Sequence, residues 1–296
     1  MIKHIKNFFN GMAFGIVETV PGVSGGTIAI ILGFYDKLIH SINNFKKDTK
    51  SSLKFLVPLA IGMVFGILLF GKIINYLLTH FSLPTMIFFI GLIVGIIPLI
   101  YGKVINADHH RIKLKEFFLI GIPILILVCI SHVEGLSIGD VDAFIAGLGW
   151  LNMLFLVGAG MVAAAALVIP GISGSFVLLL LGVYPVATAT ISAVSTYLLN
   201  PSNTPLLLDI VKVAGPLGLG IIIGGLLMVR LIENLLENHH KVIYSIILGL
   251  LIGSIYALFR NDIVYQSGVN TILITISVIT FAIGCVTSYF FGRKKF

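Results

Sequence analysis

Six long apolar segments constrain the fold of this chain more than any other feature. A helix needs about 20 residues to cross a ~30 Å hydrocarbon core. The segments cover residues 55–79, 84–102, 115–131, 211–236, 242–260 and 270–292. Charged residues make up 10% of the chain, whereas a soluble domain carries about 25%. The sequence therefore predicts an all-α polytopic membrane protein.

Two further apolar segments, 11–42 and 145–199, are each interrupted by the sequence Pro-Gly-x-Ser-Gly. The first break lies in VETVPGVSGGTIAI (17–30) and the second in VIPGISGSFVLL (168–179). Backbone that leaves the helical conformation inside hydrocarbon must have its polar groups satisfied by protein or by a water-filled cavity. Each segment is therefore either a broken spanning helix or a re-entrant hairpin that enters and leaves on one face.

The lysines around the first broken segment favour a re-entrant hairpin. Cytoplasmic loops are enriched in Lys and Arg, and basic residues lie on both sides of this segment: Lys3, Lys6, Lys37, Lys46, Lys47, Lys50 and Lys54. Both of its ends are therefore predicted to be cytoplasmic. Basic and non-basic loops then alternate up to the basic tail at 292–296, which puts the C-terminus in the cytoplasm too. The second broken segment is flanked by few charges, as is typical of outside loops.

Internal repetition extends this pattern to the whole chain. Aligning 12–42 with 161–191 pairs the two breaks, and a slightly larger offset pairs glycines of the later spans: Gly62/Gly220, Gly66/Gly224, Gly91/Gly249 and Gly95/Gly253. The sequence predicts two repeats, 1–135 and 136–296, each with one re-entrant hairpin and three spans. Three is an odd number, so the repeats are predicted to be inverted, as in many secondary transporters. The paired glycines Gly62, Gly66, Gly220 and Gly224 indicate close helix packing.

Each break has the residues of an anion site. Proline ends the entering half-helix, glycines allow close approach of a ligand, and the freed N–H groups suit phosphate or carboxylate. The predicted binding residues are Pro21, Gly22, Ser24, Gly25, Gly26 and Thr27 in the first break, and Pro170, Gly171, Ser173, Gly174 and Ser175 in the second. The alternative for either copy is a plain tight turn at the tip of a hairpin.

Charged residues inside apolar segments are costly and usually functional. Glu18, one turn before the first break, is a candidate proton or cation site or a capping carboxylate, and its repeat partner Leu167 is apolar. Lys72 and Arg230 occupy equivalent positions in equivalent spans. They either snorkel toward opposite interfaces or attract an anionic head group at each face. Glu233, one turn beyond Arg230, is placed to pair with it.

Several other classes of site find no support in the sequence. Cys129 and Cys285 lie in separate apolar segments without metal-ligand spacing, so neither a metal nor a cofactor is predicted. The net charge of +7 belongs to loops between spans, where it indicates contact with anionic lipid head groups and not with nucleic acid. The sequence leaves open whether the protein forms a homo-oligomer.

The two breaks, within ETVPGVSGGTIAIILGFYDKLI and VIPGISGSFVLLLLGVYPVA, resemble the bacterial polyprenyl-phosphate transporter family over nearly the whole chain. The resemblance implies a protein of the bacterial cytoplasmic membrane that returns undecaprenyl phosphate, a lipid carrier for wall synthesis, across that membrane. The two hairpin tips would then bind the phosphate, with Lys72 and Arg230 assisting at the two faces. Glu18 would couple the movement to a proton or another cation.

The breaks also resemble the Pro-Gly-x-Ser-Arg-Ser motif of the membrane undecaprenyl-pyrophosphate phosphatases. Gly25 and Gly26 stand where that motif has Arg and Ser, so the arginine that would stabilise phosphoryl charge is missing. The sequence therefore predicts a protein that binds phosphate without cleaving it and is not an enzyme. A phosphatase-like enzyme and an anion channel or small-anion transporter are the alternatives left open.

Overall fold

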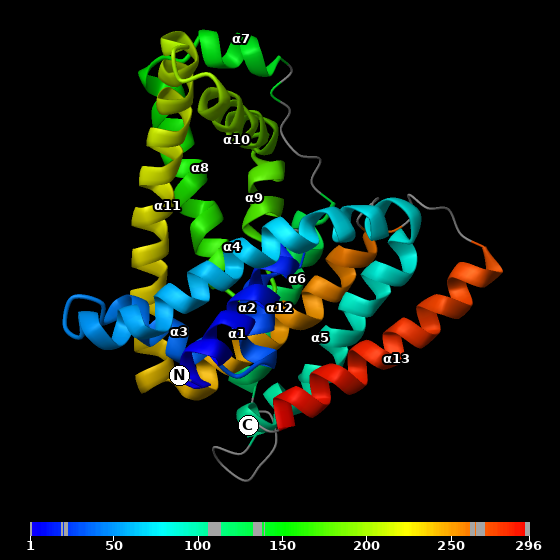
Figure 1. Cartoon of the computed structure of the whole chain (residues 1–296). Helices are drawn as coiled ribbons and strands as arrows, with labels where there is room; N and C mark the ends of the chain where they lie inside the picture. The colour runs from blue at the N-terminus through cyan, green and yellow to red at the C-terminus, as the bar shows by residue number, and fades with distance from the viewer. Residues whose placement is uncertain are drawn as a thin grey trace. The chain divides into compact units, whose positions relative to one another are not determined.

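A computed structural model describes residues 2–18, 20, 23–105, 114–132, 138, 140–260, 264 and 270–293 (Figure 1). No β-strand occurs among these residues. The helices of the first part are α1 (Ile2–Glu18), α2 (Gly25–Ile31), α3 (Tyr35–Asn43), α4 (Thr49–His80), α5 (Ser82–Ile105) and α6 (Leu114–Ile130). Those that follow are α7 (Val141–Ala146), α8 (Trp150–Val168), α9 (Gly174–Leu180), α10 (Tyr184–Leu199), α11 (Thr204–Asn238), α12 (His240–Arg260) and α13 (Thr271–Arg293).

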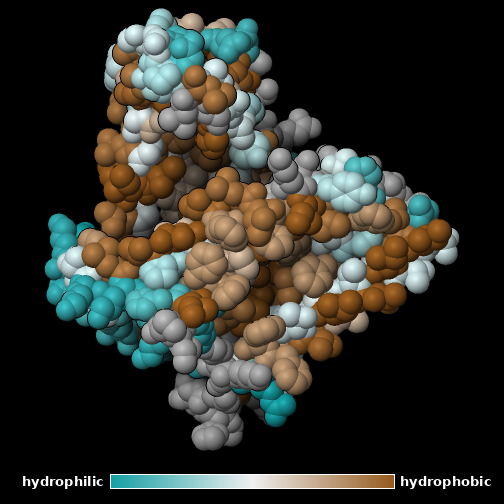
Figure 2. Space-filling view, in the orientation of Figure 1, coloured by the Kyte–Doolittle hydropathy of each residue, from teal (hydrophilic) through white to brown (hydrophobic). Residues whose placement is uncertain are grey.

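Among the described helices, α4, α5, α8, α11, α12 and α13 are long and apolar enough to cross a membrane. Five of these six correspond to predicted apolar segments. The remaining predicted segment, 115–131, forms the 17-residue helix α6, and the sixth candidate, α8, is the first part of the second broken segment. Many large apolar side chains on the candidate spans are exposed (Figure 2), among them Leu68, Ile222 and Val278. The predicted polytopic, all-helical class is therefore confirmed.

The chain forms two compact units. The first comprises Met1–His132, Ile169–Ile172 and Val229–Phe296, and the second comprises Val133–Val168 and Ser173–Met228. This division follows the packing within each unit. The predicted sequence repeats, 1–135 and 136–296, are a separate division and stay a prediction.

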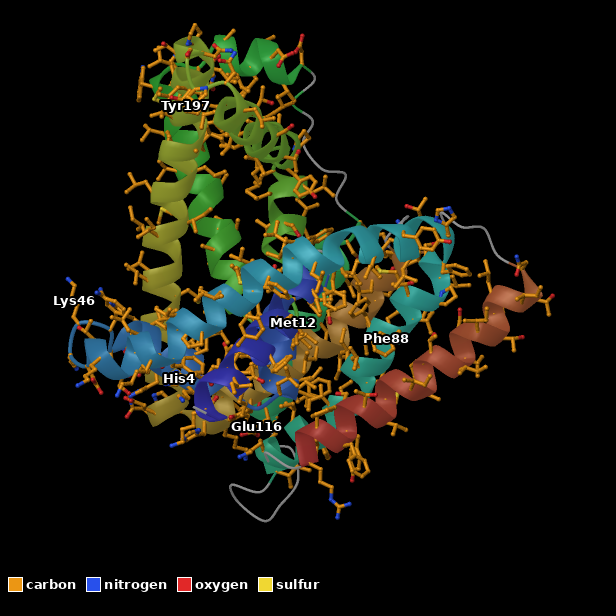
Figure 3. The ribbon with its side chains drawn as sticks, in the orientation of Figure 1. His4, Met12, Lys46, Phe88, Glu116 and Tyr197 are labelled. Carbon is orange, nitrogen blue, oxygen red and sulfur yellow. The ribbon has the colours of Figure 1, made fainter. Side chains whose placement is uncertain are left out.

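Glycines let α1 and α4 approach closely in the first unit. A Cβ atom at Gly62 would lie 2.0 Å from the carbonyl oxygen of Phe8, and one at Gly66 would lie 2.3 Å from that of Met12. Met12 is labelled in Figure 3. Contacts this short leave no room for any side chain, so the packing role predicted for Gly62 and Gly66 is confirmed.

The second unit repeats this contact between α8 and α11. A Cβ atom at Gly220 would lie 2.0 Å from the carbonyl oxygen of Val157, and one at Gly224 would lie 2.2 Å from that of Met161. In the sequence alignment Met161 is the partner of Met12, and Val157 stands opposite Phe8 at the same offset. The same helix contact therefore occurs in both sequence copies, and the packing role of Gly220 and Gly224 is confirmed. Whether the copies are inverted relative to the membrane stays a prediction.

Two other helix pairs in the first unit join one sequence half to the other. On α5, a Cβ atom at Gly91 would lie 2.4 Å from the carbonyl oxygen of Phe281 on α13. On α12, a Cβ atom at Gly249 would lie 2.3 Å from that of Ile120 on α6. Gly91 and Gly249 are repeat partners, so each half contributes a glycine-bearing helix that packs on a helix of the other half.

Candidate functional site

The described residues of the two breaks have nearly the same backbone conformation. Ser24 precedes α2 with φ −101° and ψ 129°, and Ser173 precedes α9 with φ −94° and ψ 130°. A glycine of positive φ follows each short helix, 64° at Gly33 and 72° at Gly182. Side-chain-bearing residues rarely adopt this left-handed conformation. The repeated sequence therefore folds into a repeated local structure.

After each break the chain packs back on the helix before it. The N–H of Gly25 donates a hydrogen bond to Oε1 of Glu18 over 2.8 Å, and a Cβ atom at Gly25 would lie 2.6 Å from the ring of Phe14. In the second copy, a Cβ atom at Gly174 would lie 2.8 Å from the carbonyl oxygen of Ala163. Glu18 is therefore a capping carboxylate at the start of α2. This is one of the roles that the sequence left open.

The segment Ile169–Ile172 of the second break belongs to the first unit. The first break packs directly on this segment. The hydroxyl of Ser24 donates to the carbonyl oxygen of Ile169 at 3.4 Å. The N–H of Gly171 donates to the hydroxyl oxygen of Thr27 at 3.1 Å. Ser24 and Thr27 are buried, with 2% and 1% of their surfaces exposed, so these hydrogen bonds lie inside the protein. Residues about half the chain apart thus form one polar contact.

Two glycines allow this close approach. A Cβ atom at Gly26 would lie 3.2 Å from the Cα atom of Pro170. Gly171 has a φ of 93°, and a Cβ atom there would lie 2.9 Å from the backbone of Leu250. A side chain at Gly171 would therefore meet both backbone strain and a steric clash.

The other predicted site residues are distributed as follows. In the second unit, the hydroxyls of Ser173 and Ser175 lie 2.7 Å apart. Arg230 is exposed on α11. Lys72 belongs to α4, but its side chain is outside the described part, as are residues Pro21 and Gly22 altogether. The structure thus brings Ser24, Gly25, Gly26 and Thr27 together with Pro170 and Gly171.

An apolar pocket of about 650 Å³ lies beside the first break. Helices α1, α2, α4, α5 and α13 of the first unit line it, and its polar lining side chains are Thr85, Thr280 and Thr287. Val17, next to Glu18, and Ile28, next to Thr27, connect the pocket to the break; Phe88 of its lining is labelled in Figure 3. Its volume is in the usual range of ligand pockets.

Sequence reasoning missed the polar contacts at the ends of the helices. Burial raises the pKa of Asp36 on α3 above its ordinary value, against the opposing charges of Lys103 and His240. Lys241 and Glu116 form a largely buried ion pair, with 3.3 Å between the ammonium nitrogen and Oε1. These partners come from different helices far apart in the chain, so no sequence spacing signals them.

The described part of the chain contains six candidate spans, two broken segments of the same conformation, and an apolar pocket beside one of them. These features define a multi-pass α-helical membrane protein built around a duplicated broken-helix motif.

The chain belongs to the undecaprenyl phosphate translocase-like family, which matches residues 14–276. A protein of Staphylococcus aureus named polyprenyl-phosphate transporter is 34% identical over 290 residues, which cover 97% of this chain and 95% of the relative. A protein of Vibrio cholerae with the same name is 28% identical over 271 residues, which cover 86% of this chain and 77% of the relative. No solved structure matches the chain. The resemblance found in the sequence is therefore confirmed.

Proposed function

We propose that this protein translocates undecaprenyl phosphate across the bacterial cytoplasmic membrane, so that the lipid carrier can be used again. The names of its relatives support a polyprenyl phosphate as substrate. One structural observation carries the proposal further. Two breaks rich in backbone N–H groups and hydroxyls meet at Ser24 and Ile169, directly beside an apolar pocket. A phosphate head and a hydrocarbon tail need this pairing of polar and apolar surfaces.

The phosphate head is proposed to take the place of the Glu18 carboxylate. Glu18 accepts a hydrogen bond from the N–H of Gly25, and a phosphate oxygen can accept the same bond. The Ser24 hydroxyl, once it leaves the carbonyl oxygen of Ile169, and the N–H of Gly26 are further donors, with Thr27, Pro21 and Gly22 completing the first site. A buried carboxylate without a partner is unfavourable, so the displaced Glu18 is expected to take up a proton. This exchange would couple phosphate binding to proton binding.

The second break is proposed to act as the corresponding site in the other sequence copy. It offers the hydroxyls of Ser173 and Ser175, 2.7 Å apart, together with the backbone of Gly174. Leu167 stands where the first copy has Glu18, so no carboxylate competes there. Phosphate binding at this site would therefore displace no carboxylate side chain.

The isoprenoid tail is proposed to lie in the apolar pocket while the head is bound. Its lining is hydrocarbon apart from three threonines, and transfer of apolar surface from water or a polar site into such a lining is favourable. In the proposed transport cycle, the two inverted repeats, each with a re-entrant hairpin, expose the head site alternately to the two faces. Lys72 and Arg230 would attract the head group, one at each face.

Transbilayer movement of the substrate tests this proposal. Purified protein is placed in vesicles with undecaprenyl phosphate exposed on one leaflet, and a head-group-specific probe reports its arrival in the other leaflet. We expect equilibration well above that of protein-free vesicles, and loss of it in the double variant Ser24→Ala/Ser173→Ala. Ser254→Ala is the matched control, because the hydroxyl of Ser254 is also buried but donates within its own helix.

One result would refute transport, and two others would favour the alternative functions. Equilibration no faster than in protein-free vesicles, with and without a proton gradient, would do so directly. Release of inorganic phosphate from undecaprenyl pyrophosphate would instead favour a phosphatase, and anion flux in vesicles lacking polyprenyl phosphate would favour an anion channel.

A further inference from the structure

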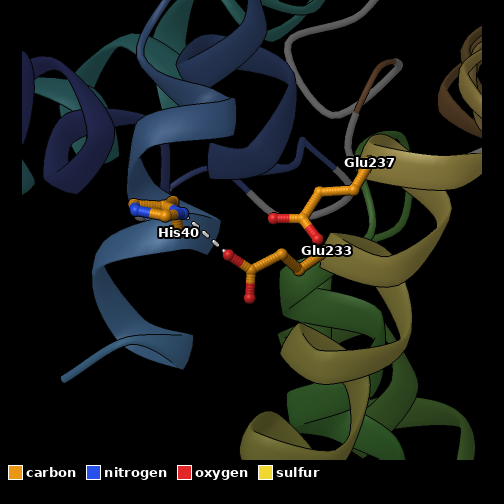
Figure 4. A group of neighbouring side chains, drawn as sticks. All are labelled: His40, Glu233 and Glu237. Carbon is orange, nitrogen blue, oxygen red and sulfur yellow. Dashed lines mark hydrogen bonds and ion pairs between the residues drawn. The ribbon is translucent and has the colours of Figure 1, made fainter. Parts of the chain in front are cut away.

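Three side chains of the kind that bind metal ions converge between α3 and the last turns of α11, all within the first unit (Figure 4). His40 lies on α3, and Glu233 and Glu237 lie one helical turn apart on α11. The Nδ1 atom of His40 is 2.8 Å from Oε1 of Glu233. One ligand atom of each residue lies within 4.8 Å of the other two. Ligands on opposite sides of one ion are separated by about 4.4 Å when the bonds are ~2.2 Å, so a small side-chain adjustment allows a shared ion.

The charge balance of this cluster favours a cation. Glu233 is buried, with 5% of its surface exposed, and like charges at positions i and i+4 of a helix repel each other. Within the described residues, His40 is the ionisable group that pairs with Glu233. The sequence placed Arg230 beside Glu233, but the described contacts of Glu233 are made with α3. Two carboxylates thus face one imidazole, and an added divalent cation would offset the excess negative charge.

Neighbouring amides hold the buried carboxylate in position. Asn43 donates a hydrogen bond from Nδ2 to Oε2 of Glu233, and Asn44 donates one from Nδ2 to Oε1 at 2.9 Å. Such contacts around a ligand fix its orientation in protein metal sites. The site is also accessible from water, because 65% of the His40 side chain is exposed and Glu237 is exposed.

The geometry points to a binding site for one divalent transition-metal cation formed by His40, Glu233 and Glu237. An imidazole nitrogen suits Zn²⁺ and other first-row metals, and carboxylate oxygens also accept Mn²⁺, whereas Mg²⁺ and Ca²⁺ prefer ligand sets made of oxygen alone. α3 follows the first break after the turn at Gly33. A bound ion would therefore join the exit of the first broken segment to the end of α11.

Metal titration of the purified, tag-free full chain tests this site. After removal of metal by a chelator, Zn²⁺, Mn²⁺ and Mg²⁺ are titrated separately by calorimetry. We expect one ion per chain for Zn²⁺ or Mn²⁺, with an affinity at least about tenfold higher than for Mg²⁺. Glu237→Gln keeps the size of an exposed side chain and removes its charge, so it is expected to weaken binding at least about tenfold.

Asp209→Asn is the matched control, since it neutralises an exposed carboxylate elsewhere on α11. It is expected to leave metal affinity unchanged. Thermal unfolding gives a second readout: the metal should raise the midpoint of the wild-type chain and not that of Glu237→Gln. Equal affinities of wild type and Glu237→Gln, or no binding at micromolar metal, would overturn the site and leave the cluster as a hydrogen-bonded contact between α3 and α11.

Discussion

The carboxylate of Glu18 accepts a hydrogen bond from the backbone N–H of Gly25, seven positions further along the chain, at 2.8 Å. This contact makes an acidic side chain the partner of an amide at the first break. Leu167, the counterpart of Glu18, cannot accept a hydrogen bond through its side chain. The two breaks therefore share a backbone conformation but differ in their capacity to exchange one anion for another.

Glu18→Gln separates the capping role of this residue from its charge. The amide oxygen of glutamine can still accept the hydrogen bond of Gly25, so we expect the thermal unfolding midpoint to change by only a few degrees. The side chain can no longer take up a proton, so transport is expected to lose its dependence on pH. Transport rates between pH 5.5 and 8.5 in vesicles measure this. An unchanged pH profile would contradict the coupling role of Glu18.

Gly25→Ala tests the packing of the first break. Its Cβ atom would lie 2.4 Å from Oε1 of Glu18 and 2.6 Å from the ring of Phe14, and overpacking typically costs about 1–3 kcal/mol. We expect a lower unfolding midpoint and slower transport. The control is Gly158→Ala, where the added Cβ atom meets nothing within 4 Å and helix propensity improves by up to about 1 kcal/mol. Equal midpoints for the two variants would argue against the tight contact.

Thr27→Val tests the polar contact between the breaks. It removes the acceptor for the N–H of Gly171 and leaves that donor buried, at a cost of about 1–3 kcal/mol. Thr27→Ser keeps the hydroxyl and loses a methyl group. We expect transport to fall severalfold in the valine variant and to survive in the serine variant. Equal losses in both variants would mean that the methyl packing of Thr27, and not its hydroxyl, matters.

Ala13→Phe tests the role of the apolar pocket. Ala13 lines this pocket, so a phenyl ring there would occupy the volume proposed for the isoprenoid tail. We expect slower movement of undecaprenyl phosphate, with less effect on a short-chain polyprenyl phosphate. Ala282→Phe places the same ring at an exposed position of α13 and should leave both rates unchanged. If Ala13→Phe slows both substrates equally, the tail does not occupy this pocket.

Local features of the sequence predicted the local features of the structure. Apolar length predicted five of the six candidate spans, and Pro and Gly predicted where the helices break. The spacing of Gly62 and Gly66 predicted a close helix contact, because glycines four positions apart share one helix face.

Contacts between distant segments had no such local signal. Ser24 and Ile169 meet only because helices between them bring the breaks together, and hydrophobic periodicity carries no information on that distance. The same is true of His40 and Glu233, where the sequence suggested the nearer partner Arg230. The pocket, too, needs helices from both ends of the chain.

Helices of one sequence half pack on helices of the other half, and this packing has a consequence for biosynthesis. The glycine surface of α5 receives α13, which leaves the ribosome roughly tens of seconds after α5 at the usual rates of synthesis. Lipid can solvate α5 in the meantime, because apolar helices in a bilayer have little hydrophobic drive to associate. A gene cut between the halves would therefore yield two inserted but incomplete products, and their coexpression, not either fragment alone, should restore the assembled protein.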